Sequence, residues 1–412
     1  MIARLVLCLA LAAASAAQGP ESPLFPGATA EAAAPVSTEP VSISTASTPA
    51  GNEISEAGRD AAPSTLSEGA VPRAAKPVRR GVHLTGWTAG SPKDRRKFIE
   101  NMKRAGLNTV VIALKEYDGR MFVRGVGLAH EIGAFVNAIP DLEACVRDFR
   151  EAGIYTIGRI VLFKDDLLAR KRPAYAVQRP DGSVWTNDNG VAWVDPYRRE
   201  VWDYNLEIAA KAAVHFDEIQ FDYIRFPSDG KISLCRYSRA DHTPKSAAEN
   251  LSRFLETARK RLEGETISVC LFGLTTTDQS GMGIGQHIKR FTELADFVSP
   301  MMYPSHYYKG EYGIPNPNRE PYRTIHRGLA EAAKRLGSLD AVRPYFQDFS
   351  LGYRYGPKEV KAQILAAARV GVTSWILWNP QNRYTWSAIP SAEEVEATRR
   401  SYLETKKAHE TN

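Results

Sequence analysis

The chain has 412 residues, of which 43% are hydrophobic and 24% are charged, so most of it can bury a core as one large domain or two moderate ones. The formal net charge is +6, and basic residues are not interleaved with aromatic residues in the manner of a nucleic-acid groove. These properties exclude a largely disordered chain and argue against nucleic acid as a partner.

Residues 1–17 have the pattern of an export signal. Arg4 precedes the apolar run LVLCLALAAASAA, whose small residues suit cleavage near Ala16 or Ala17. The run is too short for a comfortable membrane span, and no later segment is long and apolar enough to form one. We therefore expect an exported protein (periplasmic, cell-envelope or secreted) with no transmembrane segment after signal cleavage.

Residues 18–79 are rich in Ala, Ser, Thr, Pro and Glu and contain almost no aromatic residues. Such a segment cannot bury enough apolar surface to offset its ordering entropy, which predicts a disordered linker. Its acidic residues leave a net charge of about +11 on residues 69–412. A basic folded domain suits anionic glycans or a cell-envelope surface, although Lys and Arg that merely solvate helix faces explain the charge equally well.

Three cysteines remain after cleavage, Cys145, Cys235 and Cys270. Their spacing matches no metal-binding pattern, and an odd number cannot all pair within one chain. Cys270 lies in the apolar run ISVCLFG and is expected in the core, while a Cys145–Cys235 bridge stays open. We expect no metal ion and no cofactor.

From residue 80, apolar β-like runs alternate with amphipathic helical stretches, which predicts βα units and a parallel sheet. The expected strands cover residues 81–87, 108–115, 155–163, 217–226, 267–274, 297–303, 343–349 and 373–379. Eight repeats fit an α/β fold of the (β/α)8 TIM-barrel type over residues 80–405. A doubly wound open sheet is the alternative, but TGWTAGSP after the first strand is not a glycine-rich phosphate loop.

Three of the expected helices lie at residues 91–106, 142–153 and 197–215, where apolar residues recur at helical spacing. Ser91 and Pro92 form a good N-cap and first turn for the first of them. The first two end in a glycine suited to a helix C-cap. These helices would connect successive parallel strands.

The segment FDEIQFDYIRFP, residues 216–227, carries the first candidate for chemistry. Period-two alternation places Gln220 and Asp222 on one face and Ile219, Phe221 and Tyr223 on the other. A polar side chain in an apolar strand is costly to bury unless it is paired or useful. At the carboxyl end of a barrel strand, Asp222 would point into the catalytic mouth. A structural Asp–Arg pair is the alternative.

Polar and aromatic residues also gather at the other expected strand ends. They are Trp87, Lys115, Glu116, Asp165, Arg225, Tyr303, His306, Tyr307, Gln347, Asp348, Trp378 and Asn379. Carboxylates that donate a proton or attack, beside aromatic platforms, are what glycoside chemistry requires. No serine nucleophile elbow, HExxH motif or zinc-type Cys/His cluster competes. The scattered histidines, among them His83, are interpreted as structural.

Several segments in order resemble one family, the barrel domains described as "putative glycosyl hydrolase", which are distantly similar to α-amylase and α-galactosidase barrels. The resemblance covers about Gly81 to Trp386 and rests on VVIALKEYDG, GRIVLFKD, WVDPYRREVWDYN, FDEIQFDYIRFPSDG, VSPMMYPSHYYKGEYG, YFQDFSLGYRYG and ILWNPQNRYTW. It implies a (β/α)8 barrel and a carbohydrate substrate. Members carry an acid two residues before the strand-two lysine, where this chain has Ala113, and another just after it, which here is Glu116.

The resemblance implies that Asp222 is the nucleophile or base, because strand four carries the equivalent carboxylate in amylase-like barrels. For the proton donor we expect Asp348 first, since Phe346 and Phe349 would raise the pKa of its carboxyl group, and Glu116 second. Arg159, and Lys115 as well, would hold Asp222 ionised if they point inward. A structural ion pair is the alternative for Arg159.

Substrate contacts are expected from the remaining strand-end residues. Trp87, Tyr303, Tyr307 and Trp378 are candidate sugar platforms, although packing at the barrel rim would explain them equally well. The polar candidates for substrate binding are Lys115, Arg159, Asp165, Arg225, His306, Gln347 and Asn379.

Two other functions remain open. A barrel that binds glycan without cutting it is favoured by strands five and six, which offer only the distant Asp278 as an acid. A chitinase-like enzyme is suggested by DEIQFDYI, but Ile224 and Gln220 stand where that chemistry needs acids. The sequence leaves the sugar, the stereochemical outcome and the oligomeric state open.

Overall fold

The computed structural model of this chain describes residues 76–410, with side chains described up to residue 401. The predicted signal peptide, and the predicted linker up to residue 75, lie outside the described residues. The eight strands are β1 (Arg80–Leu84), β2 (Thr109–Lys115), β3 (Tyr155–Val161), β4 (Glu218–Asp222), β5 (Ile267–Phe272), β6 (Phe297–Met302), β7 (Tyr345–Gln347) and β8 (Trp375–Trp378).

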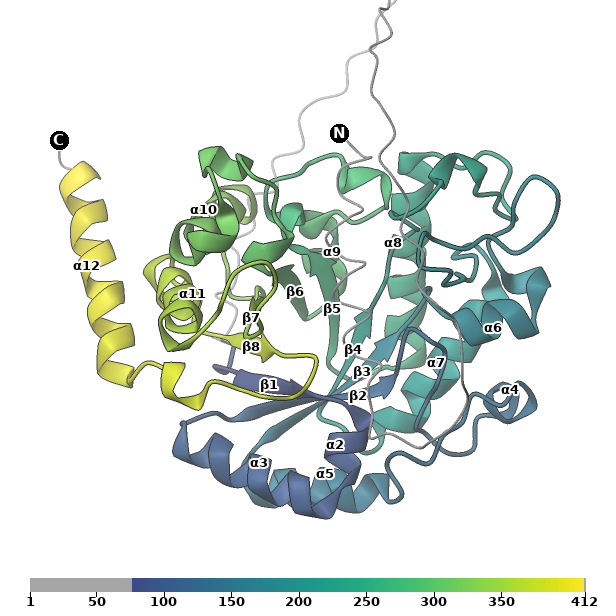
Figure 1. Cartoon of the computed structure of the whole chain (residues 1–412), viewed down its shortest axis with the longest axis horizontal. Coiled ribbons are helices and arrows are strands. Elements are labelled where there is room, and N and C mark those ends of the chain that lie inside the picture. The colour runs from purple at the N-terminus through teal and green to yellow at the C-terminus, as the bar shows by residue number, and fades with distance from the viewer. Residues whose placement is uncertain (1–75, 411–412) are drawn as a thin grey trace, which may run out of the picture. The chain divides into compact units, whose positions relative to one another are not determined.

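The strands close into one barrel in chain order, and every neighbouring pair is parallel, including β1 with β8. The predicted (β/α)8 TIM barrel is therefore confirmed. Figure 1 shows the helices arranged around the outside of the strands. They are α2 (Gly86–Gly90), α3 (Pro92–Arg104), α4 (Gly127–Glu131), α5 (Leu142–Glu151), α6 (Asp166–Lys171), α7 (Arg199–Ala213), α8 (Pro244–Arg261), α9 (Ile288–Leu294), α10 (Pro321–Leu336), α11 (Pro357–Arg369) and α12 (Ala392–Glu410).

The helix signals in the sequence act as expected. Ser91 Oγ accepts a hydrogen bond from the Asp94 N–H, and Pro92 occupies the first turn of α3. Gly106 and Gly153 follow α3 and α5 with φ of 66° and 75°, a region that costs glycine little. The chain can therefore turn sharply from each helix toward the next strand.

The first strand is shorter than predicted. β1 ends at Leu84, and α2 begins at Gly86 because Thr85 caps it, its hydroxyl accepting from the Thr88 N–H at 3.3 Å. Trp87 consequently lies on a helix instead of at a strand end.

β2 carries an irregularity that reverses its alternation. Ala113 pairs with Arg159 on β3, but the next partner, Ile160, faces Lys115. One extra residue in a strand shifts all later side chains to the opposite face. Lys115 therefore points to the helix layer, while Glu116 points inward.

The barrel interior carries polar residues at successive levels of β4. Glu218 forms a fully buried ion pair with Arg343, with Nη1 and Oε2 3.1 Å apart. One level higher, Gln220 donates to Ser268 Oγ at 3.0 Å and accepts from the Tyr345 hydroxyl at 2.6 Å. The predicted alternation along β4 thus places Gln220 and Asp222 on the inner face.

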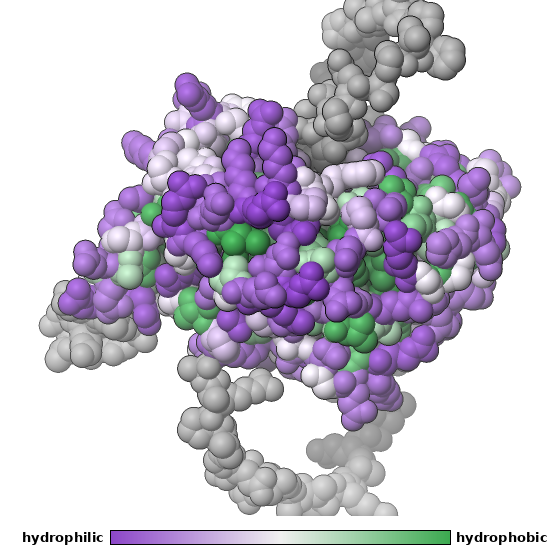
Figure 2. All heavy atoms as spheres, turned by 90° about the horizontal axis from the view of Figure 1, so that it is seen from below, coloured by the Kyte–Doolittle hydropathy of each residue, from purple (hydrophilic) through white to green (hydrophobic). Residues whose placement is uncertain are grey.

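The face of the molecule in Figure 2 is mostly hydrophilic, and its hydrophobic side chains lie in small separated groups. Within the described residues, four large hydrophobic side chains are exposed: Val78, Trp87, Val214 and Tyr322. No helix in residues 76–410 combines the length and apolar character needed to cross a bilayer.

Candidate functional site

A pocket opens where the carboxyl ends of the barrel strands meet. Its lining comes from nearly every strand end and the loops that follow, as expected for the catalytic face of a TIM barrel. The lining residues are His83, Thr85, Glu116, Tyr117, Arg159, Asp222, Tyr223, Cys270, Met301, Tyr303, His306, Tyr345, Trp378 and Pro380.

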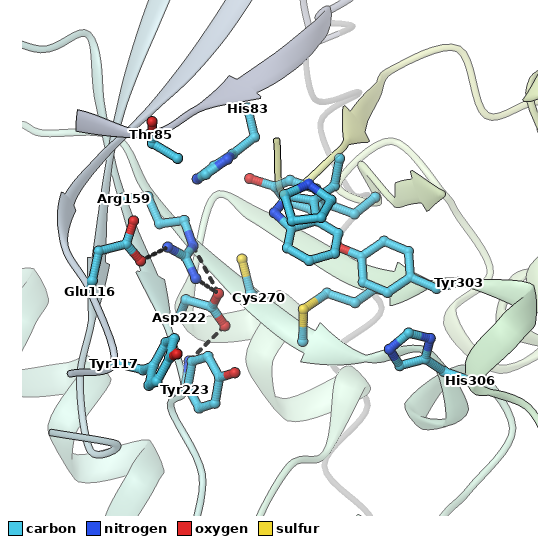
Figure 3. A pocket seen from close by; sticks show the side chains of 14 residues that line it. His83, Thr85, Glu116, Tyr117, Arg159, Asp222, Tyr223, Cys270, Tyr303 and His306 are labelled. Carbon is cyan, nitrogen blue, oxygen red and sulfur yellow. Dashed lines mark hydrogen bonds and ion pairs between the residues drawn. The ribbon is translucent and has the colours of Figure 1, made fainter. Parts of the chain in front are cut away.

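Arg159 joins two carboxylates in this pocket (Figure 3). Its Nε and Nη2 donate to Asp222 Oδ2 at 2.9 and 2.6 Å, and its Nη1 lies 3.5 Å from Glu116 Oε2. The side chain of Asp222 is 4% exposed and that of Glu116 is 25% exposed. The two acids therefore share one cation but differ in their access to solvent.

Burial and neighbouring charges shift the pKa values of Glu116 and Arg159. Burial raises the pKa of Glu116, and the charges of Asp118 and Asp222 add to this against the opposing effect of Arg159. Burial by itself lowers the pKa of Arg159, but Asp222 and Glu116 together raise it well above its ordinary value. The surroundings of Glu116 thus favour the protonated form of its carboxyl group.

Tyr223 fixes the second oxygen of Asp222. Its backbone N–H donates to Asp222 Oδ1 at 2.6 Å, and its φ of 51° is left-handed, a rare conformation for a non-glycine residue. This turn also brings the Tyr223 side chain to the pocket, although strand alternation assigns it to the outer face.

Aromatic side chains form another part of the lining. Tyr303 and Trp378 stack with centroids 5.4 Å apart and planes at 25°, and His306 meets Tyr303 edge-on. The structure brings these three predicted contacts together. Tyr307 is buried beside Tyr312 and does not line the pocket, and neither does Trp87, which is 55% exposed on α2.

Lys115 and Asp165 do not face the pocket. The Lys115 ammonium lies 2.7 Å from Asp165 Oδ2 and donates to Asn205 Oδ1 of α7 at 2.9 Å. Asp165 also caps α6 by accepting from the Leu168 N–H. Because of the irregularity in β2, the Lys115–Asp165 pair lies between the barrel and the helices. It is not the substrate contact that we expected.

Asp348 is also outside the pocket lining. Its two carboxylate oxygens accept from the Thr385 N–H and hydroxyl, each at 2.7 Å. Burial raises the pKa of Asp348, the direction that the sequence suggested, but the group ties the loop after β8 to the loop after β7. It is poorly placed to donate a proton in the pocket.

The other predicted contacts also support loops outside the pocket lining. Gln347 accepts from the Ser305 N–H, and Asn379 accepts from the backbone of Gln381. Arg225 is 2% exposed; its guanidinium donates to Ser228 Oγ at 3.0 Å and packs over Trp193, Tyr223 and Phe272. These side chains were assigned to the site because they lie at or just after strand ends, but each bonds to neighbouring groups and does not line the pocket.

The sequence interpretation missed several lining residues, above all His83, Tyr345 and Cys270. Strict alternation along GVHLT would have placed His83 and Thr85 inward, and the same alternation from Gln347 reaches Tyr345. All three cysteines outside the masked residues are free and buried, so Cys145 and Cys235 form no bridge. Among residues 76–410, no group of three or more His, Cys, Asp or Glu side chains could hold a metal ion.

The family described as "putative glycosyl hydrolase domain" matches residues 81–384, nearly the whole barrel. The chain belongs to this family. It is thereby assigned to the glycoside hydrolases, in agreement with the carboxylates found at the barrel mouth. No curated protein matches the chain.

Solved structures with the same fold include the glycoside hydrolase domain of PgaB (BpsB) from Bordetella bronchiseptica, with 15% identity, a TM-score of 0.56, and coverage of 78% of this chain and 98% of that one. α-L-Fucosidase isoenzyme 2 from Paenibacillus thiaminolyticus has 12% identity, a TM-score of 0.53, and coverage of 80% and 49%. A hypothetical protein from Ruminiclostridium thermocellum is 33% identical over 46% of this chain and 96% of its own, with a TM-score of 0.42.

Proposed function

We propose that this chain is an exported glycoside hydrolase that cleaves a poly- or oligosaccharide, with Asp222 acting at the anomeric carbon and Glu116 donating the proton to the leaving oxygen. The observation that carries the proposal is the pair of carboxyl groups held by Arg159 at the mouth of the barrel. Glycoside hydrolysis requires two such groups with different protonation states.

The surroundings of each carboxyl group fit these roles. Asp222 accepts three N–H hydrogen bonds, two from Arg159 and one from Tyr223, which suit a carboxylate that carries its negative charge. Glu116 is held by one longer contact, and burial raises its pKa. A protonated Glu116 can transfer its proton to the glycosidic oxygen as the bond to the anomeric carbon breaks.

Asp222 then either bonds to the anomeric carbon or removes a proton from the water that attacks it. In the first case water later releases the sugar from Asp222 and returns a proton to Glu116. In the second, one displacement releases the sugar, and exchange with solvent then removes the proton from Asp222 and restores that of Glu116. Arg159 stabilises the negative charge of both groups as it moves between them. Tyr303 and Trp378 offer aromatic surface to the sugar rings.

Glu116 replaces Asp348 as the proposed proton donor. Glu116 lines the same pocket as Asp222, whereas both oxygens of Asp348 are occupied by Thr385. A proton donor must come within hydrogen-bond reach of the leaving oxygen.

Export is supported by the signal pattern of residues 4–17 and by the composition of the segment that follows. Mass spectrometry of the protein recovered from the extracytoplasmic fraction should find an N-terminus at residue 17 or 18. Recovery of chains that still carry Arg4 and the apolar run would contradict export by cleavage.

A barrel that binds glycan without cutting it is the second candidate. The observation that favours it is that β5 and β6 contribute Cys270, Met301 and the nearby Tyr303 to the pocket, and no acid.

The test compares the unaltered protein with the Asp222→Asn/Glu116→Gln double variant on a panel of polysaccharides and oligosaccharides. New reducing ends should appear with the unaltered protein on at least one glycan and not with the double variant. Retained binding by both proteins without any release of reducing ends would favour the second candidate. Release of reducing ends by both proteins would contradict the assignment of Asp222 and Glu116 to the catalytic site.

A further inference from the structure

We propose that the pocket beside Asp222 selects an uncharged sugar residue, whose hydroxyl groups hydrogen-bond to the imidazoles of His83 and His306. This inference rests on the proposed function, because it names the class of sugar that the same site takes. It stands on two observations: unpartnered ring nitrogens of both histidines, and the way the charges of the lining are already paired.

His83 is the first of these groups. It lies at the end of β1, points toward Arg159 in Figure 3, and is 4% exposed. Neither ring nitrogen has a hydrogen-bond partner among the described residues. A buried polar group without a partner costs free energy, so a ligand that supplies one gains that energy on binding.

His306 is the second group and comes from the loop after β6. Its Nδ1 lies 2.9 Å from Ser305 Oγ, and its Nε2 has no partner among the described residues. Figure 3 shows it beside Tyr303, well separated from His83 and Arg159 in the view. Buried ring nitrogens without a hydrogen-bond partner therefore lie in two different parts of one lining.

The protonation of both rings fits sugar hydroxyls. Burial, with a contribution from Arg159, lowers the pKa of His83 well below its ordinary value, and burial lowers that of His306 to about 4. A neutral imidazole has one donor and one acceptor nitrogen. A hydroxyl group can match either nitrogen, since it both donates and accepts, whereas a carboxylate can only accept.

The charged residues of the pocket lining also favour an uncharged sugar. Of the described lining residues, Glu116, Arg159 and Asp222 are the charged ones, and the Arg159 guanidinium already bonds to both acids. Lys115 and Arg225 point elsewhere. A sugar with its own carboxylate would be buried beside Asp222 without a cation of its own, which is unfavourable.

Lys164 does not add a cation to the pocket lining. Its ammonium lies over the rings of Tyr117 and Tyr223, 5.1 and 5.4 Å from their centroids, and the residue is 3% exposed and not part of the lining. Burial lowers its pKa to about 8. Its ammonium thus contacts the two tyrosine rings and is not one of the charged groups of the lining.

The selection concerns the sugar residue in the pocket and not the whole polymer. The net charge of about +11 on residues 69–412 can still attract anionic groups further along a glycan. A polymer in which charged and neutral residues alternate would satisfy both features.

The experiment measures binding of matched monosaccharides by isothermal titration calorimetry and saturation-transfer NMR: glucose against glucuronic acid, and galactose against galacturonic acid. We expect at least one neutral sugar to bind and its uronic acid to bind at least about tenfold more weakly. His83→Phe and His306→Phe should each weaken the neutral sugar about tenfold, while His326→Phe on α10, outside the pocket, should not.

His83→Asn keeps a donor and an acceptor, and it should bind the neutral sugar more tightly than His83→Phe. This comparison remains valid if one variant folds poorly. The inference would be overturned if the uronic acids bind as tightly as the neutral sugars or more tightly. It would also be overturned if His83→Phe and His306→Phe both bind the neutral sugar unchanged, or if neither neutral sugar binds. Because no cleavage is measured, a protein that binds neutral sugars but cuts no glycan would contradict the proposed hydrolysis and leave this inference intact.

Discussion

Arg159 donates two hydrogen bonds to a single oxygen of Asp222, from Nε at 2.9 Å and from Nη2 at 2.6 Å. The third nitrogen of the guanidinium remains available to Glu116, 3.5 Å away. One cation on β3 therefore organises acids that come from β4 and from the end of β2. This arrangement places the carboxyl groups at one end of the barrel with their orientations constrained.

Arg159→Met should destabilise the protein by about 3–5 kcal/mol, because it leaves Asp222 buried without its cation. Urea unfolding at pH 7 measures the free energy of unfolding. The matched control is Arg290→Met: Arg290 also bridges two acids, Glu256 at 2.8 Å and Glu293 at 3.1 Å, but it is 45% exposed. That variant should lose about 1 kcal/mol or less. An equal loss of unfolding free energy in both variants would contradict the claim that burial makes the loss of the Arg159 cation more costly.

Glu116→Gln should slow hydrolysis of unactivated glycans by about 10²–10⁴-fold, the usual contribution of a general acid. Aryl glycosides with a dinitrophenolate leaving group need little protonation, and their kcat/KM, which reports the step that releases the leaving group, should stay nearly that of the unaltered protein. A similar loss on both substrate types would argue against Glu116 as the proton donor.

The pH dependence of cleavage should report the same residue. A general acid must be protonated, so activity falls as the pH rises through its pKa. Since burial raises the pKa of Glu116, the basic limb of kcat/KM should lie above the ordinary carboxyl value of 4.5. In Glu116→Gln this limb should disappear. A limb that persists unchanged in the variant would belong to another group.

Lys115→Met should also cost about 3–5 kcal/mol of stability, because Asp165 is buried and loses its cation. Lys334→Met, at an exposed pair with Glu331, is the control and should change stability by less than about 1 kcal/mol. Below its unfolding temperature, Lys115→Met should keep an unchanged KM. A raised KM with normal stability would restore the substrate contact expected from sequence.

The barrel itself was predictable from the sequence because apolar strand-like runs recur eight times and alternate with amphipathic helical stretches. Period-two alternation correctly placed Asp222 on the inner face, whereas the sequence left the direction of Arg159 open and the structure shows it pointing inward. The reversal at β2 was not predictable, because an irregularity in strand pairing depends on the neighbouring strand and leaves no mark in VVIALKE. The structure was therefore needed to show that Lys115 faces the helix layer and Glu116 faces the pocket.

Loop residues were the least predictable part of the site. A position just after a strand indicates the correct end of the barrel, but the path of the loop decides where each side chain points. Asp348 and Asn379 follow their strands as closely as Glu116 does, yet Asp348 bonds to the loop after β8 and Asn379 bonds within its own loop. His83, in contrast, could have been found, since alternation from Gly81 places it inward.

Trp378→Ala should raise KM for the responsive glycan about tenfold, which corresponds to about 1.4 kcal/mol of lost binding. Its ring stacks on Tyr303 in the pocket lining. Trp87→Ala removes an aromatic ring of the same type from outside the pocket and should leave KM unchanged. If Trp87→Ala weakens binding as much as Trp378→Ala does, the glycan extends over α2.

The most direct test of the central claim is the turnover number of Asp222→Asn on the glycan that the unaltered protein cleaves best. Circular dichroism should show an unchanged fold. The pairing of Asp222 with Arg159 at the barrel mouth predicts a fall in kcat of about 10³-fold or more, because amide oxygen neither attacks the anomeric carbon nor removes a proton from water. Undiminished turnover by the folded variant would contradict the account.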